Sequence, residues 1–432
     1  MPLPAAFIER LSEVSRELSE VQKPIRVLRA LAWPPEVRED FFARGARELP
    51  RATYEGPRFD VAATVRRLRE ITARISGDND IERLLRDTCE SYEIAAQLLA
   101  SVGTRRFWAL SCELYGRPQS VSCDGKTTNL ALAEHFDRVI DHYAGQGLGL
   151  VEDKPELTAL EVAEELQRRF DRFFVHHPIR VEVVDSLSAN AVAGADVVKI
   201  NRASGFSRRD VEQLAHHEGY VHVATTLNGR SQPLFSILGT GAPRTTRTQE
   251  GLAIFSEFIS QTMDLERLRR LTDRILAIKM AEDGASFLEL YRYFLEHGHA
   301  PTQAFECARR VCRGGLVEGG APFTKDVVYL DGLIRVSNFL RVAITSGKLE
   351  YVQTLFVGKL DLSDIPIFAQ LRREGVLAEP RYLPDWARDL PFLTAYMAYS
   401  AFLNQTDLDA THEYYEDIIA RAEASLVTKA IA

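Results

Sequence analysis

The chain contains 432 residues, of which 46% are hydrophobic and 26% are charged, so it is long enough to bury a substantial core in one or two domains. Its formal net charge of −8 argues against a general nucleic-acid-binding protein, and the absence of any apolar run of about 18 residues argues against a membrane span. Because the first residues lack the basic and apolar segments of a secretory signal, we expect a cytoplasmic protein with no nucleic-acid or membrane partner.

Helical periodicity dominates the first 175 residues. Proline and glycine interrupt it at Pro34-Pro35 and at Gly116-Arg117-Pro118. We therefore interpret residues 1–175 as an N-terminal helical region. The predicted helices in this region are Phe7–Val21, Val61–Ile75, Ile81–Val102, Leu130–Tyr143 and Leu157–Phe174.

From Ile179 onward the pattern changes to alternating and β-branched residues, which predict short strands over 180–184 and 195–200. These strands directly precede a helix that contains two histidines. An edge strand at this position could hold an extended peptide through main-chain hydrogen bonds. We therefore predict a second region, residues 176–432, with a zincin-like catalytic core, in a predominantly helical α+β fold.

The histidine helix reads His217-Glu218-Gly219-Tyr220-Val221-His222. A capping box at Ser207–Asp210 starts it, and Asn228-Gly229 is expected to end it. Zinc hydrolases use neutral imidazoles and carboxylates as ligands, one position left open for water, and a nearby carboxylate to accept the proton of that water. His217 and His222 are therefore candidate ligands of Zn²⁺, and Glu218 is the candidate base.

The two histidines are five residues apart, whereas the common zinc-peptidase motif H-E-x-x-H separates them by four. On an ideal α-helix a separation of five places side chains about 140° apart, which is too divergent for two Zn–N bonds. A π-bulge of one turn would restore a shared face. We predict this distortion around Gly219.

The third ligand is predicted from the following helix, which begins with Gln249-Glu250-Gly251-Leu252-Ala253. Glu250 suits the role of a carboxylate ligand. Glu257, two turns later, is the alternative third ligand or a partner for an imidazole N–H. A lone H-E-x-x-x-H arises by chance in many long helical proteins, but the well-bounded helix and the following Glu250 favour a site.

After Glu250 the helical pattern returns without an internal repeat. The predicted helices are Leu265–Met280, Phe287–Glu296, Thr302–Val311, Val327–Ile344 and Glu413–Leu426. An odd number of cysteines without Cys-x-x-Cys spacing indicates reduced and mostly buried thiols at Cys89, Cys112, Cys123, Cys307 and Cys312.

These motifs resemble the QEGLA-motif family, on the basis of HEGYVH, the basic stretch 244–248, QEGLA and Phe323–Tyr329. That family includes bacterial proteins labelled flavohaemoglobin expression-modulating and the animal microtubule-associated tyrosine carboxypeptidases. The resemblance implies a zinc metallopeptidase and, in the animal members, removal of a C-terminal tyrosine from tubulin tails. It also implies that His217, His222 and Glu250 are metal ligands and that Glu218 is the base. It does not supply the substrate of this chain.

A carboxypeptidase must also hold the terminal carboxylate of its substrate with a cation beside the metal, and the planar guanidinium of arginine suits this task. Arg247 and Arg313 are the preferred pair, and Lys325 is a further candidate. A solvated or structural role is more common for any single cation in a chain with 53 lysines and arginines. Other candidates are Arg244 and Arg310.

Tyr329, four residues after Lys325 on the same predicted helical face, is a candidate donor to the oxyanion of the reaction. A purely structural role, as a half-buried tyrosine, is nearly as common for a residue at such a position.

Two functions follow from the sequence. The first is a zinc-dependent carboxypeptidase that removes a C-terminal residue from a peptide or protein by Glu-assisted attack of a metal-activated water. The resemblance implies that this residue is tyrosine or another aromatic residue. The second is a non-catalytic, zinc-containing regulatory binding protein. Glu218 favours the first, because a structural zinc needs no base and usually fills its fourth position with another ligand.

Overall fold

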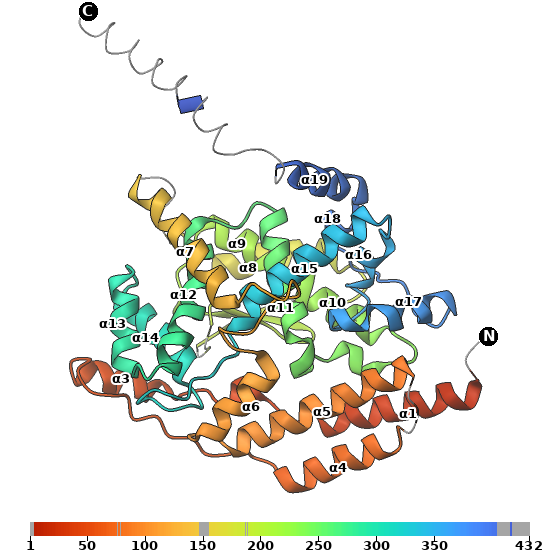
Figure 1. The fold of residues 1–432 in the computed structure, drawn as a ribbon, viewed down its shortest axis with the longest axis horizontal. Helices are drawn as coiled ribbons and strands as arrows, with labels where there is room; N and C mark the ends of the chain where they lie inside the picture. Colours follow the sequence, from red (N-terminus) through yellow and green to blue (C-terminus); the bar gives the residue numbers. More distant parts are fainter. Residues whose placement is uncertain are drawn as a thin grey trace, which may run out of the picture.

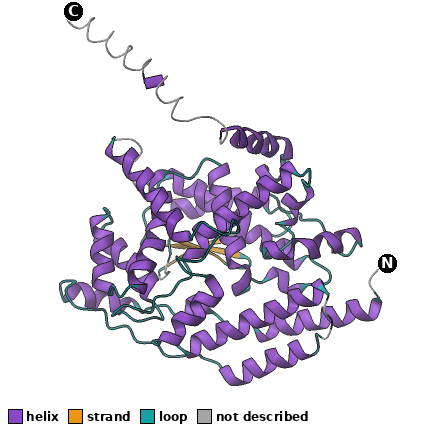
Figure 2. Cartoon of the chain, viewed as in Figure 1, coloured by secondary structure: helices purple, strands orange, loops and turns teal. Residues whose placement is uncertain are grey.

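The computed structural model describes residues 4–75, 77, 79–146, 155–185, 187, 189–403 and 415–416. Helices make up most of these residues, and Figures 1 and 2 show them surrounding one small sheet. The predicted class, a predominantly helical α+β fold, is confirmed. No helix of the described part of the chain is long and apolar enough to cross a membrane.

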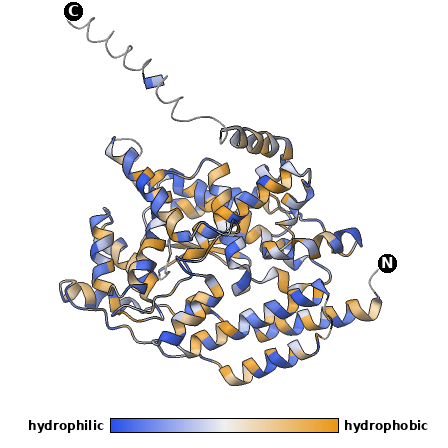
Figure 3. Cartoon of the chain, viewed as in Figure 1, coloured by the Kyte–Doolittle hydropathy of each residue, from blue (hydrophilic) through white to orange (hydrophobic). Residues whose placement is uncertain are grey.

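The helices between residues 5 and 115, apart from the one at Pro35–Ala43, pack side by side at one end of the molecule (Figure 1). All of them except the four-residue helix Val27–Ala30 bury one apolar stripe, and Figure 3 shows hydrophobic and hydrophilic bands alternating along them. The predicted helices are confirmed here, but three were not predicted. Helix α3 begins at the predicted interruption, because proline fits the first turn of a helix. The elements are α1 (Ala5–Val21), α2 (Val27–Ala30), α3 (Pro35–Ala43), α4 (Val61–Ala73), α5 (Asp80–Ala100) and α6 (Arg105–Tyr115), of which α2, α3 and α6 were missed.

The sheet follows α7 (Asn129–Gly145) and α8 (Ala159–Phe173). Its strand order is β1-β3-β2, with β1 parallel and β2 antiparallel to β3. Helix α8 packs against the sheet, where its Phe170 shares a buried cluster with Val198 and Ile200 of β3. The short β2 was not predicted, and on its other side no strand pairs with it among the described residues. The strands are β1 (Arg180–Val184), β2 (Ala191–Ala193) and β3 (Val197–Asn201).

The histidine helix runs without a break through three segments: α9 (Arg208–Leu214), the π-helix η1 (Ala215–Val223) and α10 (Ala224–Arg230). The predicted capping box at Ser207 is present. Two short 3₁₀ turns, η2 (Ser236–Gly239) and η3 (Pro243–Thr245), then lead into α11 (Thr246–Ile259). Helix α11 packs closely against α15 (Val327–Thr345) near the centre of Figure 1.

The remaining helices enclose this central pair. The predictions over residues 265–345 are confirmed to within a few residues, and the helices near the C-terminal end were missed. The predicted helix Glu413–Leu426 lies outside the described residues except for 415–416. The elements are α12 (Leu265–Glu282), α13 (Phe287–Glu296), α14 (Pro301–Cys312), α16 (Glu350–Thr354), η4 (Leu362–Asp364), α17 (Ile365–Arg373), α18 (Asp385–Arg388) and α19 (Leu390–Leu403).

One large hydrophobic cluster spans the chain from α1 to α19, and it includes Leu85 of α5, Leu252 of α11 and Leu330 of α15. Residues on both sides of the predicted boundary near 175 therefore share a core, and the division into two regions stays a prediction. All five cysteines are free thiols, and only Cys123 is exposed.

Candidate metal centre and active site

The π-helix places His217 and His222 on one face of the histidine helix. Their ring centroids lie 4.9 Å apart. The predicted widening of the turn is confirmed, although it extends over nine residues rather than one turn. Because a π-helix bonds each residue to the fifth along, it aligns side chains at this spacing where an α-helix would not.

Gly219 lies at the centre of this π-helix, where the distortion was predicted, and it also has a packing role that was not predicted. An ideal Cβ at this position would lie 2.2 Å from Cε1 of Phe170 in α8. The glycine therefore allows α8 to pack directly on the π-helix, so the reason for a glycine here is close packing of two helices.

The candidate ligand atoms converge as a metal site requires. Oε2 of Glu250 lies 3.6 Å from Nε2 of His217 and 3.6 Å from Nε2 of His222. Ligand atoms bound at about 2.1 Å to a tetrahedral ion are roughly 3.4 Å apart, so the spacing fits a three-ligand zinc site. Within the described residues, these three form the one group of histidine, cysteine or carboxylate side chains close enough to hold a metal ion.

Two glycines in contact set the position of Glu250. An ideal Cβ on Gly251 would lie 2.2 Å from the carbonyl carbon of Gly332, and one on Gly332 would lie 2.2 Å from the carbonyl oxygen of Arg247. The backbones of α11 and α15 therefore touch at this point. Next to Glu250, Gln249 accepts a hydrogen bond of 2.8 Å from Oγ1 of Thr225 in α10, which ties α11 to the histidine helix.

Glu257 is the partner of His217 rather than the third ligand. Nδ1 of His217 donates to Oε1 of Glu257 at 2.6 Å, on the ring edge opposite Nε2. Glu257 is fully buried and also accepts hydrogen bonds from Arg267 and Gln213. Such a carboxylate fixes the orientation and tautomer of a metal-binding imidazole. Nδ1 of His222 has no hydrogen-bond partner within the described residues.

Burial and neighbouring charges shift the pKa values of the three candidate ligands, and the directions differ. Burial alone would lower the pKa of His217, but Glu250 and Glu257 raise it to about 10. Burial lowers the pKa of His222. Burial raises the pKa of Glu250, but Lys325 and the two histidines outweigh this and hold it well below its usual range. Without a metal ion, the two carboxylates therefore favour the protonated form of His217.

Lys325, predicted to bind substrate, lies against the proposed third ligand. Its Nζ donates to Oε1 of Glu250 at 3.0 Å, so the two oxygens of Glu250 face different partners. Burial would lower the pKa of Lys325, but Glu250 raises it above its usual value. Tyr329 is half-buried, and its hydroxyl lies 3.4 Å from the same Nζ. The structure thus brings Lys325 and Tyr329 beside the ligands.

The two predicted arginines lie elsewhere. Nε of Arg247 forms an ion pair with Asp331 of α15 at 2.7 Å, and Nη2 donates to the carbonyl oxygen of Tyr115. Arg313 is 2% exposed and stacks on the ring of Phe323. Its pKa is lowered to about 10 by burial and by Arg310. The structure gives neither guanidinium a contact with the three ligand residues.

Glu218 projects from the π-helix toward the open edge of the sheet. Its Oε2 accepts a hydrogen bond of 2.7 Å from the backbone N–H of Ala193 in β2. The carboxylate of Glu218 therefore links the histidine helix to β2.

Sequence reasoning missed one charged residue at the site. Lys359 lies in the loop after α16; burial lowers its pKa to about 8, and the charges of Glu250 and Glu218 act against that shift. No motif or periodicity marks this lysine, because the loop that carries it is distant in sequence from the histidine helix.

Comparison with known proteins supports the resemblance seen in the motifs. The profile of the family described as microtubule-associated tyrosine carboxypeptidase matches residues 39–405. No curated protein gives a match to the chain. The matched segment covers most of the sequence and includes every residue of the candidate site. The chain therefore belongs to the microtubule-associated tyrosine carboxypeptidase family.

Proposed function

We propose that the protein is a zinc-dependent carboxypeptidase that removes a C-terminal residue from a peptide or protein. The observation that carries the proposal is the convergence of His217, His222 and Glu250 on one point, with Glu218 beside them. Family membership supports the class of enzyme, since the family description names a tyrosine carboxypeptidase.

Each residue of the site has a role in this proposal. Zinc held by the two histidines and Glu250 would polarise the substrate carbonyl and activate a water molecule. Glu218 accepts the proton of that water and delivers it to the leaving amine. Tyr329, held next to Lys325, donates to the oxygen that becomes negatively charged in the transition state.

The edge of β2 supplies a binding surface for the substrate main chain. Among the described strands, only β3 pairs with β2, so the other side of β2 is an edge, and the Ala193 N–H of β2 already bonds Glu218. A peptide that adds to this edge as an extra strand would lie across the candidate metal centre. Recognition through main-chain groups suits an enzyme that accepts several sequences before the terminal residue.

The presence of Glu218 and the number of ligands favour the catalytic proposal over a purely regulatory zinc protein. A structural zinc site normally has four protein ligands, whereas only three side chains converge here within the described residues. The open position and the adjacent carboxylate favour a hydrolase.

A pair of substitutions tests the proposal. Glu218→Gln keeps the shape of the side chain but cannot accept a proton at neutral pH, so it should retain zinc and lose roughly 10²- to 10⁴-fold in cleavage rate. His217→Ala should lose zinc, measured by elemental analysis. Cleavage by Glu218→Gln at the rate of the parent protein would show that Glu218 is not the base. Full zinc content in His217→Ala would show that His217 is not a ligand.

A further inference from the structure

Three cations surround the ring of Tyr329 beside the candidate metal centre. Nζ of Lys325 lies 4.7 Å from the centroid of this ring. Cζ of Arg274, on α12, lies 4.9 Å from the same centroid, and Cζ of Arg310, on α14, lies 6.0 Å from it. Such distances give a favourable interaction between a cation and the face of the ring. Because the hydroxyl of Tyr329 is the proposed donor to the oxyanion, the three cations lie around the place where the substrate carbonyl would bind.

Carboxylates neutralise two of these three cations. Lys325 is paired with Glu250, with Nζ 3.0 Å from Oε1. Arg310 donates two hydrogen bonds, of 2.6 and 2.9 Å, to the two oxygens of Asp326. Arg274 lies 3.9 Å from Asp326, which is beyond hydrogen-bond distance, and no residue in the described part of the chain accepts a hydrogen bond from it. Its guanidinium therefore keeps all five N–H donors for a ligand.

Arg274 is both charged and accessible. Its side chain is 17% exposed, so a ligand can reach it. Burial and the neighbouring Arg310 lower the pKa of Arg274 to about 10, and it stays protonated at neutral pH. A largely desolvated guanidinium without a hydrogen-bonded counter-ion is costly to maintain. An anionic group supplied by a ligand would remove this cost.

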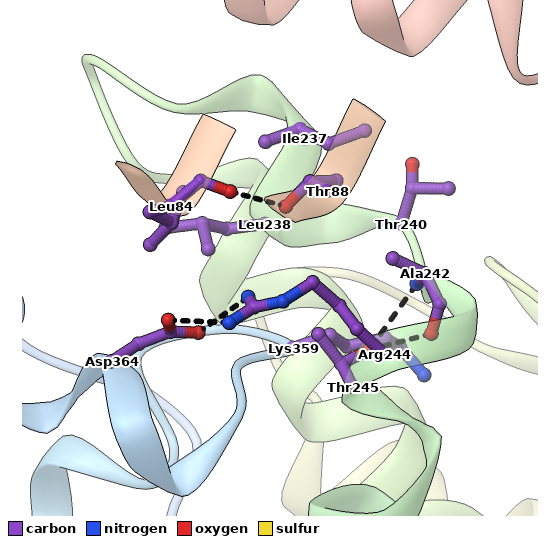
Figure 4. Close-up of a pocket in the computed structure, with 10 residues that line it drawn as sticks. All are labelled: Leu84, Thr88, Ile237, Leu238, Thr240, Ala242, Arg244, Thr245, Lys359 and Asp364. Carbon is purple, nitrogen blue, oxygen red and sulfur yellow. Dashed lines mark hydrogen bonds and ion pairs between the residues drawn. The ribbon is translucent and has the colours of Figure 1, made fainter. Parts of the chain in front are cut away.

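Three arginines considered from the sequence are not available in the same way. Figure 4 shows Arg244 in a two-fold ion pair with Asp364, with both distances 2.8 Å, in a small pocket that contains none of the candidate metal ligands. Arg247 is paired with Asp331, and Arg313 is 2% exposed. The first two arginines therefore have their charges balanced within the fold, and the third is shielded from solvent.

The position of Arg274 fits the length of one terminal residue. A single residue separates the scissile carbonyl from the terminal carboxylate and spans at most about 3.3–3.6 Å, and a charge-assisted hydrogen bond adds about 2.8 Å. The cation must therefore lie roughly 6–7 Å from that carbonyl. Arg274 and Lys325 contact the same ring, and the hydroxyl of this ring, on Tyr329, is the proposed partner of the carbonyl oxygen. The contact with the ring thus places the guanidinium about one residue beyond the carbonyl.

We propose that Arg274 binds the C-terminal carboxylate of the substrate and so restricts the enzyme to the last residue of a chain. This inference rests on the proposed carboxypeptidase function. It assigns to Arg274 the role predicted for Arg247 and Arg313. The planar guanidinium can donate two parallel hydrogen bonds to a carboxylate, whereas an amidated terminus carries no charge and offers one acceptor oxygen.

The test measures peptide binding to zinc-loaded protein in a Glu218→Gln background, by fluorescence anisotropy with a labelled peptide ending in tyrosine. Its free-acid and amidated forms are compared at pH 7. We expect the Glu218→Gln protein to prefer the acid by more than about tenfold. Adding Arg274→Met should reduce this preference to within about twofold, and adding Arg274→Lys should retain part of it, because the charge remains without the fork.

The control variant is Arg270→Met, which removes a partly exposed arginine of the same helix that is paired with Glu266, and it should leave the acid preference unchanged. Zinc content and thermal unfolding are measured for every variant. If Arg274→Met loses zinc or fails to fold, Arg274→Gln, which is neutral but polar, takes its place with the same expected result.

The outcomes separate the two proposals. An acid preference that survives neutralisation of Arg274 would overturn this inference and leave the carboxypeptidase proposal intact. Equal binding of acid and amide by the Glu218→Gln protein would also overturn it. Equal cleavage of both peptides by the parent protein would overturn the carboxypeptidase proposal as well.

Discussion

Replacing Glu257 by glutamine tests whether the buried carboxylate organises the metal centre. The side chain is fully buried and accepts hydrogen bonds from His217, Gln213 and Arg267. Glutamine has the same shape but no charge, so Arg267 would be left buried without its counter-ion. Removing one partner of a buried ion pair costs about 3–5 kcal/mol. Losing the carboxylate partner of a metal-binding histidine lowers metal affinity about 10- to 100-fold.

The assay has two readouts. Chemical denaturation of the metal-free protein gives the free energy of unfolding, and competition with a zinc chelator gives the zinc affinity. Glu266→Gln, which removes a half-exposed partner of Arg270 on α12, is the matched control and should change stability by less than about 0.5 kcal/mol. Adding Arg267→Met to Glu257→Gln should recover part of the loss, because it removes the unpaired charge.

The pH dependence gives an independent check. Burial raises the pKa of Glu257, but Arg267 and His217 outweigh it and lower the pKa from 4.5 to about 2. A carboxylate with a depressed pKa stabilises the fold above its unfolded pKa, and this stabilisation is lost as the pH falls toward the folded pKa. The stability difference between parent and Glu257→Gln should therefore shrink between about pH 4.5 and pH 2. Unchanged stability and zinc affinity in Glu257→Gln at pH 7 would refute the reasoning.

Two further predictions concern the contact between α11 and α15 and the charge of the candidate metal ligands. Gly251→Ala should cost more than about 2 kcal/mol, because the new Cβ would meet the backbone of Gly332, whereas Gly145→Ala, at an open position, should cost nothing; equal stability of the two variants would contradict the packing argument. Zinc binding at pH 8 should release about one proton, because the pKa of His217 is raised to about 10 and a ligand must be neutral. Calorimetry in buffers of different ionisation enthalpy measures this number, and a value near zero would show that His217 is not a protonated ligand of the metal-free site.

The local part of the site could be predicted from the sequence because its chemistry lies in short motifs. The five-residue spacing of His217 and His222 is incompatible with a regular α-helix, and this single geometric conflict predicted the π-helix. Glu250 could be predicted as the third ligand because it lies near the start of the next helix. The distortion around Gly219 was predicted, but its close contact with Phe170 was not, because Phe170 lies on another helix and no local pattern contains that contact.

Contacts between residues distant in sequence explain the other differences between the predicted and the observed site. Arg247 is close to Glu250 in sequence, yet Asp331 of α15 forms an ion pair with it. The influence of Glu250 and Glu218 on the pKa of Lys359 was missed because this lysine lies in a loop more than one hundred residues beyond the histidines. Both outcomes depend on tertiary packing, which charge patterns along the chain do not encode.

Mass spectrometry of peptide products tests the central claim most directly. Zinc-loaded protein is incubated with a peptide that ends in tyrosine, and the masses of the products are followed over time beside the Glu218→Gln variant. The account predicts loss of the terminal residue from the free-acid peptide by the parent protein, little loss from the amidated peptide, and no measurable product with Glu218→Gln. Internal cleavage, or no cleavage of any peptide by fully zinc-loaded protein, would contradict it.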